Sequence, residues 1–443
     1  MKTESKIARR KMFFAERLMH VDGHGSAILK ACIMIRGPIR EENFRSALSK
    51  LQEKHSQLRM RIEGNYFVFD DNVPPIPLRI IQRTSDTQWK DEMESDIKTP
   101  IDYKNGPLVR FIWLRSEERS DIIVITTHTI MDGISIEYLF RELMTIIENP
   151  EKSIEKHAPI LSLGDILPGI KISRWEKLLA RSLVPPASLL LYLSMIGKKE
   201  KPVKYCELEW SLTEEETAAL KKATKKHGVQ HYSLQCIAMA KAFSKYHNPG
   251  QKKRKVFMSL DIRRYIPAIK RDMMFAYAPM LVFNPDFSKG DDYWQLTHKF
   301  GQELIYKAIT EPKIKRTFIT YPIPEGTLFT EQMHGLIKPL VRRNLRVDTG
   351  QDFNFVNLGM HRYSSMDKKL ELEMIKVGST IPWYNSNLFY ICEVKGMFCY
   401  NLSANTHLIS EDKCLKIRDE FMNIIHDILA SDNPDTKSTV PFQ

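Results

Sequence analysis

The spacing of hydrophobic and polar residues predicts alternating strands and helices over the first 150 residues of the chain. Residues 26–37 form an apolar run that stops at a Gly-Pro pair, which is typical of a strand. In residues 40–55, Phe44, Leu48 and Leu51 recur at positions i, i+4 and i+7, which predicts a helix with one apolar face. The other elements expected here are short strands in NYFVFDD and LRIIQR, a helix over 87–98, a hairpin formed by 107–115 and 121–128, and a helix after Gly133 that ends at Asn149-Pro150.

A second series of predicted elements begins near residue 205 and has a similar mixture of hairpins and helices. The Thr213-Glu216 spacing resembles a capping box at the start of a helix. The elements expected are a strand over 204–213, helices in LTEEETAALKKATKKHG and SLQCIAMAKAFSKYH, a strand in KVFMSLDI, helices over 292–309 and 330–342, a strand over 351–359, a hairpin over 387–405 and a helix over 410–429. Because 443 residues are too many for one ordinary core, we predict two mixed α/β lobes, residues 1–164 and residues 205–443.

The segment between the predicted lobes, residues 165–204, differs in composition from both. It holds eight Lys and Arg against three Asp and Glu, and its apolar stretch from Leu183 to Gly197 is broken by two prolines. That stretch is shorter than the ~20 residues needed to span a bilayer. One interpretation is a crossover that buries its apolar side on the core; the other is a helical hairpin that contacts a membrane surface, with the protein peripheral to it.

The net charge indicates an acidic partner. The net charge is +12 and the isoelectric point is near 9.2. Such a surface suits a phosphate-bearing substrate, an acidic carrier protein, an anionic membrane or nucleic acid. The basic residues are scattered and no nucleic-acid-binding motif is present, so a nucleic-acid partner is not expected. The alternative is simply a well-solvated, lysine-rich surface.

The cysteines and histidines argue against a metal or disulfide framework. Six cysteines occur without a CxxC pair, and no HExxH or compact ligand spacing is found among 13 histidines. The chain also lacks a P-loop and a GxGxxG motif. The basic N-terminus has no apolar core of a secretory signal, so a reducing cytoplasm is the expected location, with no metal.

The stretch VITTHTIMDGIS contains the candidate chemistry. A buried-type strand delivers His128 to its carboxyl end, and Asp132-Gly133 follows four residues later. A histidine with a pKa near ~6.5 is a suitable general base at neutral pH. Since GxSxG is absent, an acceptor would attack a thioester directly, without an acyl-enzyme. Asp132 could fold back toward His128 or pair with an arginine, and a simple turn with a satisfied histidine is the alternative.

HTIMDG matches the HxxxDG motif, and the chain resembles the chloramphenicol-acetyltransferase-like superfamily, which includes condensation domains of peptide synthetases, polyketide-associated acyltransferases and alcohol acyltransferases. Three other stretches agree in order and spacing with segments of that superfamily. They are LQEKHSQLRMRI (51–62), SLDIRRYIP (259–267) and NFVNLG (354–359). Together the four matches cover almost the whole chain.

The resemblance implies a mixed α/β fold of two lobes, arranged as a pseudo-dimer with a tunnel between them. A thioester donor and an acceptor would enter from opposite faces and meet at His128, the general base. Asn357 and Gly359 would shape the interface between the lobes and take no part in catalysis.

The same resemblance implies that Asp132 is structural and pairs with Arg263 of the SLDIRRYIP stretch. A buried carboxylate needs a partner, and an arginine can hold it with two hydrogen bonds. Gly133 would spare the steric cost of a side chain in the turn.

Two departures from the superfamily patterns bear on function. Condensation domains usually carry two adjacent histidines, whereas Thr127 stands before His128 here, and the DFGWG motif of plant acyltransferases is replaced by NFVNLG. We therefore expect transfer of an acyl group from acyl-CoA or a phosphopantetheinyl acyl carrier protein, as co-substrate, to a small-molecule alcohol, with no bound cofactor. The alternatives are a free-standing condensation enzyme that forms an amide from an amine, and a non-catalytic carrier-docking protein.

Overall fold

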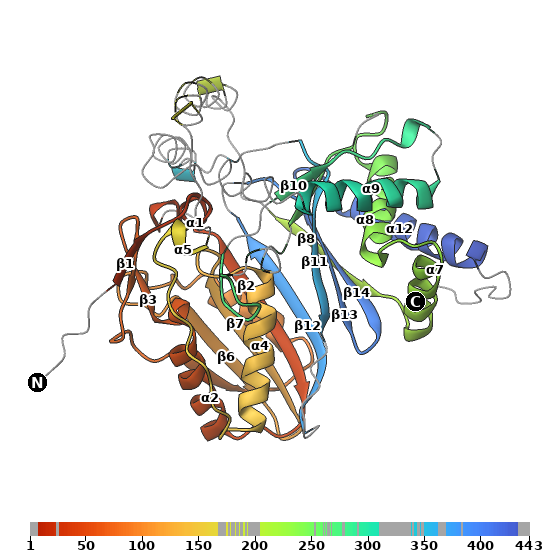
Figure 1. Cartoon of the computed structure of the whole chain (residues 1–443). Helices are drawn as coiled ribbons and strands as arrows, with labels where there is room; N and C mark the ends of the chain where they lie inside the picture. The colour runs from red at the N-terminus through yellow and green to blue at the C-terminus, as the bar shows by residue number, and fades with distance from the viewer. Residues whose placement is uncertain are drawn as a thin grey trace, which may run out of the picture.

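The chain forms two lobes, each built around its own β-sheet (Figure 1). The computed structural model describes residues 8–23, 26–166, 204–251, 254–259, 268–276, 280–289, 292–309, 350–361, 369–381 and 384–432, together with isolated residues between these ranges, Arg263 among them. In Figure 1 the N-terminal lobe runs from red to yellow and the C-terminal lobe from green to blue. The predicted fold class, two mixed α/β lobes, is confirmed.

The main sheet of the N-terminal lobe has five strands in the order β12-β2-β7-β6-β5. All neighbours are antiparallel except β5 and β6, which are parallel. The strands are β2 (Ile28–Arg36), β5 (Leu78–Gln82), β6 (Val109–Arg115), β7 (Arg119–Thr127) and β12 (Glu371–Thr380). A small sheet of β1 (Ala8–Lys11), β4 (Tyr66–Phe69) and β3 (Met60–Glu63) stands beside it, with the short helices α1 (Phe14–His20), η1 (Val21–Gly23), η2 (Ser56–Arg59) and α5 (Leu163–Ile166).

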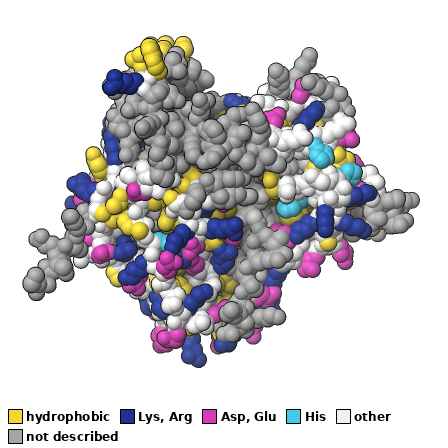
Figure 2. Space-filling view, viewed as in Figure 1, with side chains coloured by type: hydrophobic (Ala, Val, Ile, Leu, Met, Phe, Trp, Pro, Cys, Tyr) yellow, Lys and Arg dark blue, Asp and Glu magenta, His cyan; other side chains and the backbone are white. Residues whose placement is uncertain are grey.

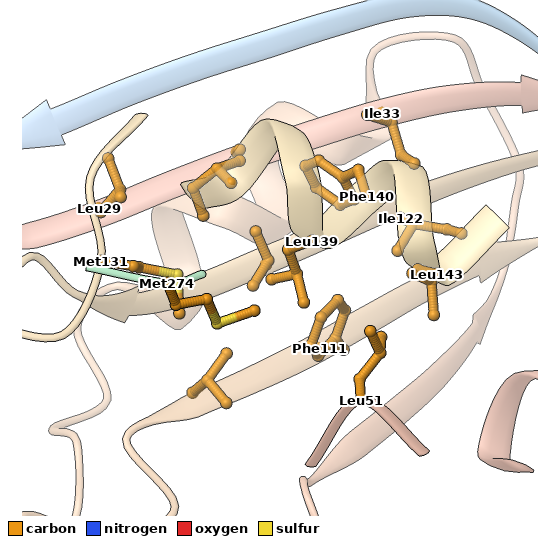
Figure 3. Packing of buried hydrophobic residues seen from close by; sticks show 14 of the residues in the cluster. Leu29, Ile33, Leu51, Phe111, Ile122, Met131, Leu139, Phe140, Leu143 and Met274 are labelled. Carbon is orange, nitrogen blue, oxygen red and sulfur yellow. The ribbon is translucent and has the colours of Figure 1, made fainter. Parts of the chain in front are cut away.

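Helices cover both faces of this sheet because its strands are apolar on both sides. Helices α2 (Glu41–Lys54) and α4 (Gly133–Glu148) pack on one face, where Leu139 and Leu143 meet Ile122 (Figure 3). Helix α3 (Gln88–Asp96) packs on the other face through Trp89 and Met93. Alternate residues of β7 therefore enter different cores, which explains why this strand is a continuous apolar run.

The C-terminal lobe has a six-stranded mixed sheet in the order β10-β9-β11-β13-β14-β8. Its strands are β8 (Tyr205–Ser211), β9 (Val256–Ser259), β10 (Met280–Phe283), β11 (Phe353–His361), β13 (Leu388–Val394) and β14 (Met397–Asn405). Helices cover the face that Figure 1 turns to the right: α7 (Glu214–Lys226), α8 (His231–Tyr246), α9 (Tyr293–Ile309) and α12 (Glu411–Asp432), with the short η4 (Phe287–Lys289) nearby. The predicted capping box is present, since Thr213 accepts from the amide of Glu216 and the Glu216 side chain returns to Thr213.

One strand from the C-terminal half joins the N-terminal sheet. β12 pairs along its length with β2, from Glu371 opposite Arg36 to Thr380 opposite Ile28, and lies beside it in Figure 1. The lobe boundaries at residues 164 and 205 stay a prediction, and the position of β12 shows that residues 371–380 complete the other lobe's sheet. The pairing of β12 with β2 therefore joins the two lobes through a continuous set of strand contacts.

Charged side chains also tie the two halves of the chain together. The Lys54 ammonium lies 2.5 Å from a Glu142 carboxylate oxygen and 2.6 Å from one of Asp272, which belongs to the C-terminal half. His55, from the LQEKHSQLRMRI stretch, places Nε2 2.6 Å from the other Glu142 oxygen. These contacts hold segment 268–276 against α2 and α4, and Arg263 lies just before that segment.

The entry of β12 depends on Gly37. Gly37 has a φ of +122°, and a Cβ atom at this position would collide with the carbonyl oxygen of Lys369. We expect Gly37→Ala to lower the free energy of unfolding by roughly 2–4 kcal/mol in a urea titration. Gly64→Ala is the matched control, because Gly64 also has a positive φ (+58°) but nothing within 4 Å of the added Cβ. Equal losses in the two variants would mean that the contact with Lys369 is unimportant.

Two predicted features fall mainly outside the described residues: the segment 165–204 and the helix at 330–342. Of the described residues in the first, five large apolar side chains are exposed, and Figure 2 shows hydrophobic atoms at the top, where Figure 1 draws these residues in yellow-green. They are Trp175, Leu178, Leu189, Leu190 and Leu193. Within the described part of the chain, no helix combines the length and the hydropathy that a bilayer crossing requires. Both interpretations of segment 165–204 stay predictions.

Candidate active site

His128 stands directly after the last residue of β7, in the loop that leads into α4. Its amide donates a hydrogen bond of 2.8 Å to the carbonyl of Ala27, so the backbone is held against the segment that enters β2. Next to it, the Thr127 and Thr129 hydroxyls lie 2.8 Å apart. The loop is therefore fixed on both sides of the histidine.

The imidazole of His128 is half-buried, and its environment favours the neutral form. Burial lowers the pKa of His128, while the Asp132 carboxylate and the backbone carbonyl groups of His128 and Met131 offset this only in part. Nδ1 is buried without a hydrogen-bond partner within the described part of the chain. A neutral imidazole at pH 7 has a lone pair that can accept a proton.

Asp132 begins helix α4 and has two tasks. As the N-cap residue it accepts a hydrogen bond of 2.8 Å from the Ser135 amide, and the Ser135 hydroxyl donates to the same oxygen, Oδ1. Its carboxylate also accepts hydrogen bonds from both terminal nitrogens of Arg263, Nη2 at 2.9 Å and Nη1 at 3.1 Å. The carboxylate thus turns toward the arginine, which leaves the His128 ring without it as a hydrogen-bond partner.

Arg263 is 4% exposed, and oxygen atoms surround its guanidinium. Beyond Asp132 it donates to Asp261 at 3.1 Å, to the Ser135 hydroxyl at 2.8 Å and to the carbonyls of Met273 and Phe275. Although burial opposes the charge, Asp132 and then Asp261 raise the pKa of Arg263 above its ordinary range. Arg263 lies four residues beyond the end of β9 and has 3-10 helical conformation, so it does not belong to the strand expected from the resemblance.

Gly133 is the first residue of α4. Packing against a neighbouring side chain, and not an unusual backbone conformation, explains why a glycine stands here. It is not among the glycines with positive φ, so the tight turn expected from the sequence does not need a glycine. A Cβ atom on Gly133 would instead lie 2.9 Å from Cδ2 of Leu358, a residue of the C-terminal lobe. The small residue lets the two lobes approach each other beside His128.

Asn357 and Gly359 flank Leu358 in an irregular part of β11. The register with β13 shifts between Asn357 and Met360, Gly359 has a φ of +81°, and its amide donates to Oδ1 of Asn357 at 2.9 Å. Such a bulge redirects the side chain next to it. Asn357 and Gly359 thus stand in sequence on either side of the leucine that meets Gly133, and their role at the lobe interface stays a prediction.

A cavity of about 440 Å³ lies between the two sheets on the α3 side of this junction. Its walls include Trp89 of α3, Lys376 of β12, Tyr390 of β13 and Leu358. His128 is not among the lining residues, and the predicted tunnel that reaches it stays a prediction. Leu358 lines this cavity and also lies against Gly133 at the start of α4.

Over almost its whole length the chain resembles several solved structures. It matches TRI3 trichothecene 15-O-acetyltransferase from Fusarium sporotrichioides with a TM-score of 0.69 over 97% of both chains, at 13% sequence identity. It matches the first condensation domain of the CDA synthetase with a TM-score of 0.67, again over 97% of both chains, at 12% identity. Polyketide synthase associated protein 5 from Mycobacterium tuberculosis gives 0.64 over 95% of this chain and 99% of that one, at 14% identity. The chain has the condensation-domain fold.

Sequence comparison agrees for the N-terminal part of this condensation-domain fold. Residues 5–162 match the family described as Condensation domain. Among curated proteins, the nonribosomal peptide synthetase dtxS1 of Metarhizium robertsii is 27% identical over 144 residues, 32% of this chain and 2% of that protein. The chain spans at most 15% of the length of the curated relatives it matches.

Three residues of the candidate site are absent from the sequence-based prediction: Ser135, Asp261 and Leu358. Ser135 could have been found, because Asp132 and Ser135 have the spacing of an N-cap and its N3 partner. Leu358 has no such local signal, since it acts through a contact with Gly133 in a distant segment. Asp261 lies only two residues before Arg263, and its role is visible only once that arginine is placed. Among the described residues, no group of three or more His, Cys, Asp or Glu side chains is arranged to hold a metal ion.

Proposed function

We propose that the protein transfers an acyl group from a thioester donor to a hydroxyl acceptor, with His128 as the general base. The neutral imidazole takes the proton of the hydroxyl while its oxygen attacks the thioester carbonyl. The carbon–sulfur bond then breaks, and the departing thiolate takes the proton back from the imidazolium. The products are an ester and a free thiol, and no covalent acyl-enzyme is formed.

The observation that carries this proposal is that Asp132 and His128 have separate hydrogen-bond partners. The Asp132 carboxylate accepts hydrogen bonds from Ser135 and Arg263, while His128 is held by its backbone and has a lowered pKa. An imidazole without a carboxylate hydrogen bond stays neutral and can exchange a proton. The arginine clamp keeps the loop in place from the opposite half of the chain.

The donor is proposed to be acyl-CoA or an acyl carrier protein. Both bring phosphate, and carrier proteins are acidic, which suits a net charge of +12. Figure 2 shows basic side chains interspersed with acidic ones over the visible face, so attraction by the whole molecule supports this partner better than a single basic patch. Asn357 and Gly359 are proposed to shape the junction and to take no part in the chemistry.

Amide formation from an amine acceptor is the second candidate. The family matched by residues 5–162 and the curated relatives, which are peptide synthetases, favour it. Against it, Thr127 replaces the first of the two adjacent histidines that resemblance to condensation domains leads one to expect.

Product identification separates these candidates. Purified protein is incubated with acyl-CoA of several chain lengths and with a set of small alcohols and matched primary amines, and products are identified by mass spectrometry. We expect ester products to form at least about tenfold faster than amides. Faster amide formation would favour the condensation enzyme. Absence of both products, also with acyl carrier protein as donor, would favour a non-catalytic carrier-docking protein.

A further inference from the structure

Two cysteine thiols face each other across neighbouring strands of the C-terminal sheet. Cys392 of β13 pairs directly with Cys399 of β14, so the two residues lie opposite each other on neighbouring strands. Residues opposed in this way have Cα atoms about 4.5–5.5 Å apart, a distance that a disulfide can span. Both residues are free thiols in this structure.

Both thiols also line the 440 Å³ cavity between the two sheets. Each residue is only 9% exposed, but the exposed part faces a space large enough for a small reagent. The pair therefore differs from cysteines that are enclosed in a core, whose thiols a reagent can reach only after unfolding.

Charge in the cavity wall favours a thiolate on one of the two. The neighbouring Cys392 thiol lowers the pKa of Cys399, and so does the Lys376 ammonium, although burial and Glu209 oppose them. Lys376 is itself paired with Glu209 at 2.8 Å, which limits its effect. The Cys399 thiol, together with burial, raises the pKa of Cys392. One thiol is thus prepared to attack and the other to resolve.

We propose that Cys392 and Cys399 form a dithiol site at which a small disulfide oxidises the folded protein. The Cys399 thiolate attacks one sulfur of the reagent, forms a mixed disulfide and releases one thiol, which takes up a proton. Cys392 then loses its proton and attacks Cys399 Sγ, which closes the Cys392–Cys399 bond and releases the second thiol. The protein loses two electrons and two protons, and the reagent gains both. This site is independent of the proposed acyl transfer.

The chain offers an internal comparison. The thiols of Cys206 of β8 and Cys414 of α12 also influence each other's pKa. Burial raises the pKa of both thiols, to about 12 for Cys414, and neither is among the described residues that line the cavity. An interaction between thiols is thus common to the two pairs, whereas access and a favourable charge belong only to Cys392 and Cys399.

Glutathione disulfide is the probe, applied to the native full-length protein at pH 7.5, with peptide mapping by mass spectrometry. We expect an internal Cys392–Cys399 disulfide to form at least about tenfold faster than any modification of Cys206 or Cys414. Cys392→Ser should trap one glutathione on Cys399, because the resolving thiol is missing. The double variant Cys206→Ser/Cys414→Ser should react like the wild type.

Modification that begins at another cysteine, or only in denaturant, would overturn the proposal. Lys376→Met keeps it testable should the cysteine variants fold poorly. This variant retains all six thiols and should shift the pH profile of the reaction with glutathione disulfide to higher pH. An unchanged pH profile with the same modified cysteines would show that Lys376 has no effect on the reactivity of Cys399. Failure of the wild type to react first at Cys399 would contradict the proposed dithiol site.

Discussion

His128→Ala is expected to lower the rate of acyl transfer by about 10²–10⁴-fold, because the attacking hydroxyl loses its proton acceptor. The fold should survive, since His128 is only half-buried and its Nδ1 lacks a hydrogen-bond partner among the described residues. The measurement is kcat and kcat/KM with the best donor and acceptor found in the product assay. Circular dichroism in the near ultraviolet reports on the fold.

The pH dependence gives a second, independent readout. Burial lowers the pKa of His128, so kcat/KM of the wild type should rise with pH through a midpoint below that of an ordinary histidine. In His128→Ala the residual activity should lack this rise. Activity near the wild-type level, or an unchanged pH profile, would rule out His128 as the base. His298→Ala is the matched control, because His298 is exposed on α9, and it should retain full activity.

Most elements could be predicted because their apolar spacing matches one period over their whole length. Helix α2 has Phe44, Leu48 and Leu51 all buried, and the hairpin at Lys395-Gly396 has a two-residue turn with positive φ at both positions. Strand β12 was not predicted from the sequence, because a bulge interrupts its alternation of buried and exposed side chains. Leu372 and Ile375 are buried three residues apart, and the register with β2 shifts between Leu372 and Met374. A period-2 search cannot follow that shift.

In the candidate site, too, some features have a local sequence signal and others depend on distant contacts. The cap formed by Asp132 and Ser135 has a local signal within four residues, and the exposure of His128 at a strand end follows from the apolar run before it. The partnership of Asp132 with Arg263 joins residues 131 positions apart, so only the resemblance suggested it. Packing of Leu358 on Gly133 depends on a bulge in a different lobe. Contacts between lobes are set by tertiary packing, which no local pattern encodes.

Replacement of Arg263 by methionine is expected to produce the largest loss of stability. Methionine fills part of the space of the arginine stem but leaves the Asp132 carboxylate buried without its two strongest partners. Loss of one member of a buried ion pair costs about 3–5 kcal/mol. Urea unfolding of the two proteins measures the difference. Arg271→Met is the control: Arg271 is exposed, and its replacement should change the free energy of unfolding by less than about 0.5 kcal/mol.

A second variant separates the loss of the clamp from the cost of the stranded charge. In Asp132→Asn/Arg263→Met the buried charge is gone, and asparagine can still cap α4. This double variant should therefore be more stable than Arg263→Met alone, by about 1–3 kcal/mol. Its acyl transfer should stay low, because the ion pair that joins the HxxxDG loop to Arg263 is then gone. If the double variant were both stable and fully active, Asp132 and Arg263 would be dispensable, and the position of His128 would have to be set by the backbone contact to Ala27 alone.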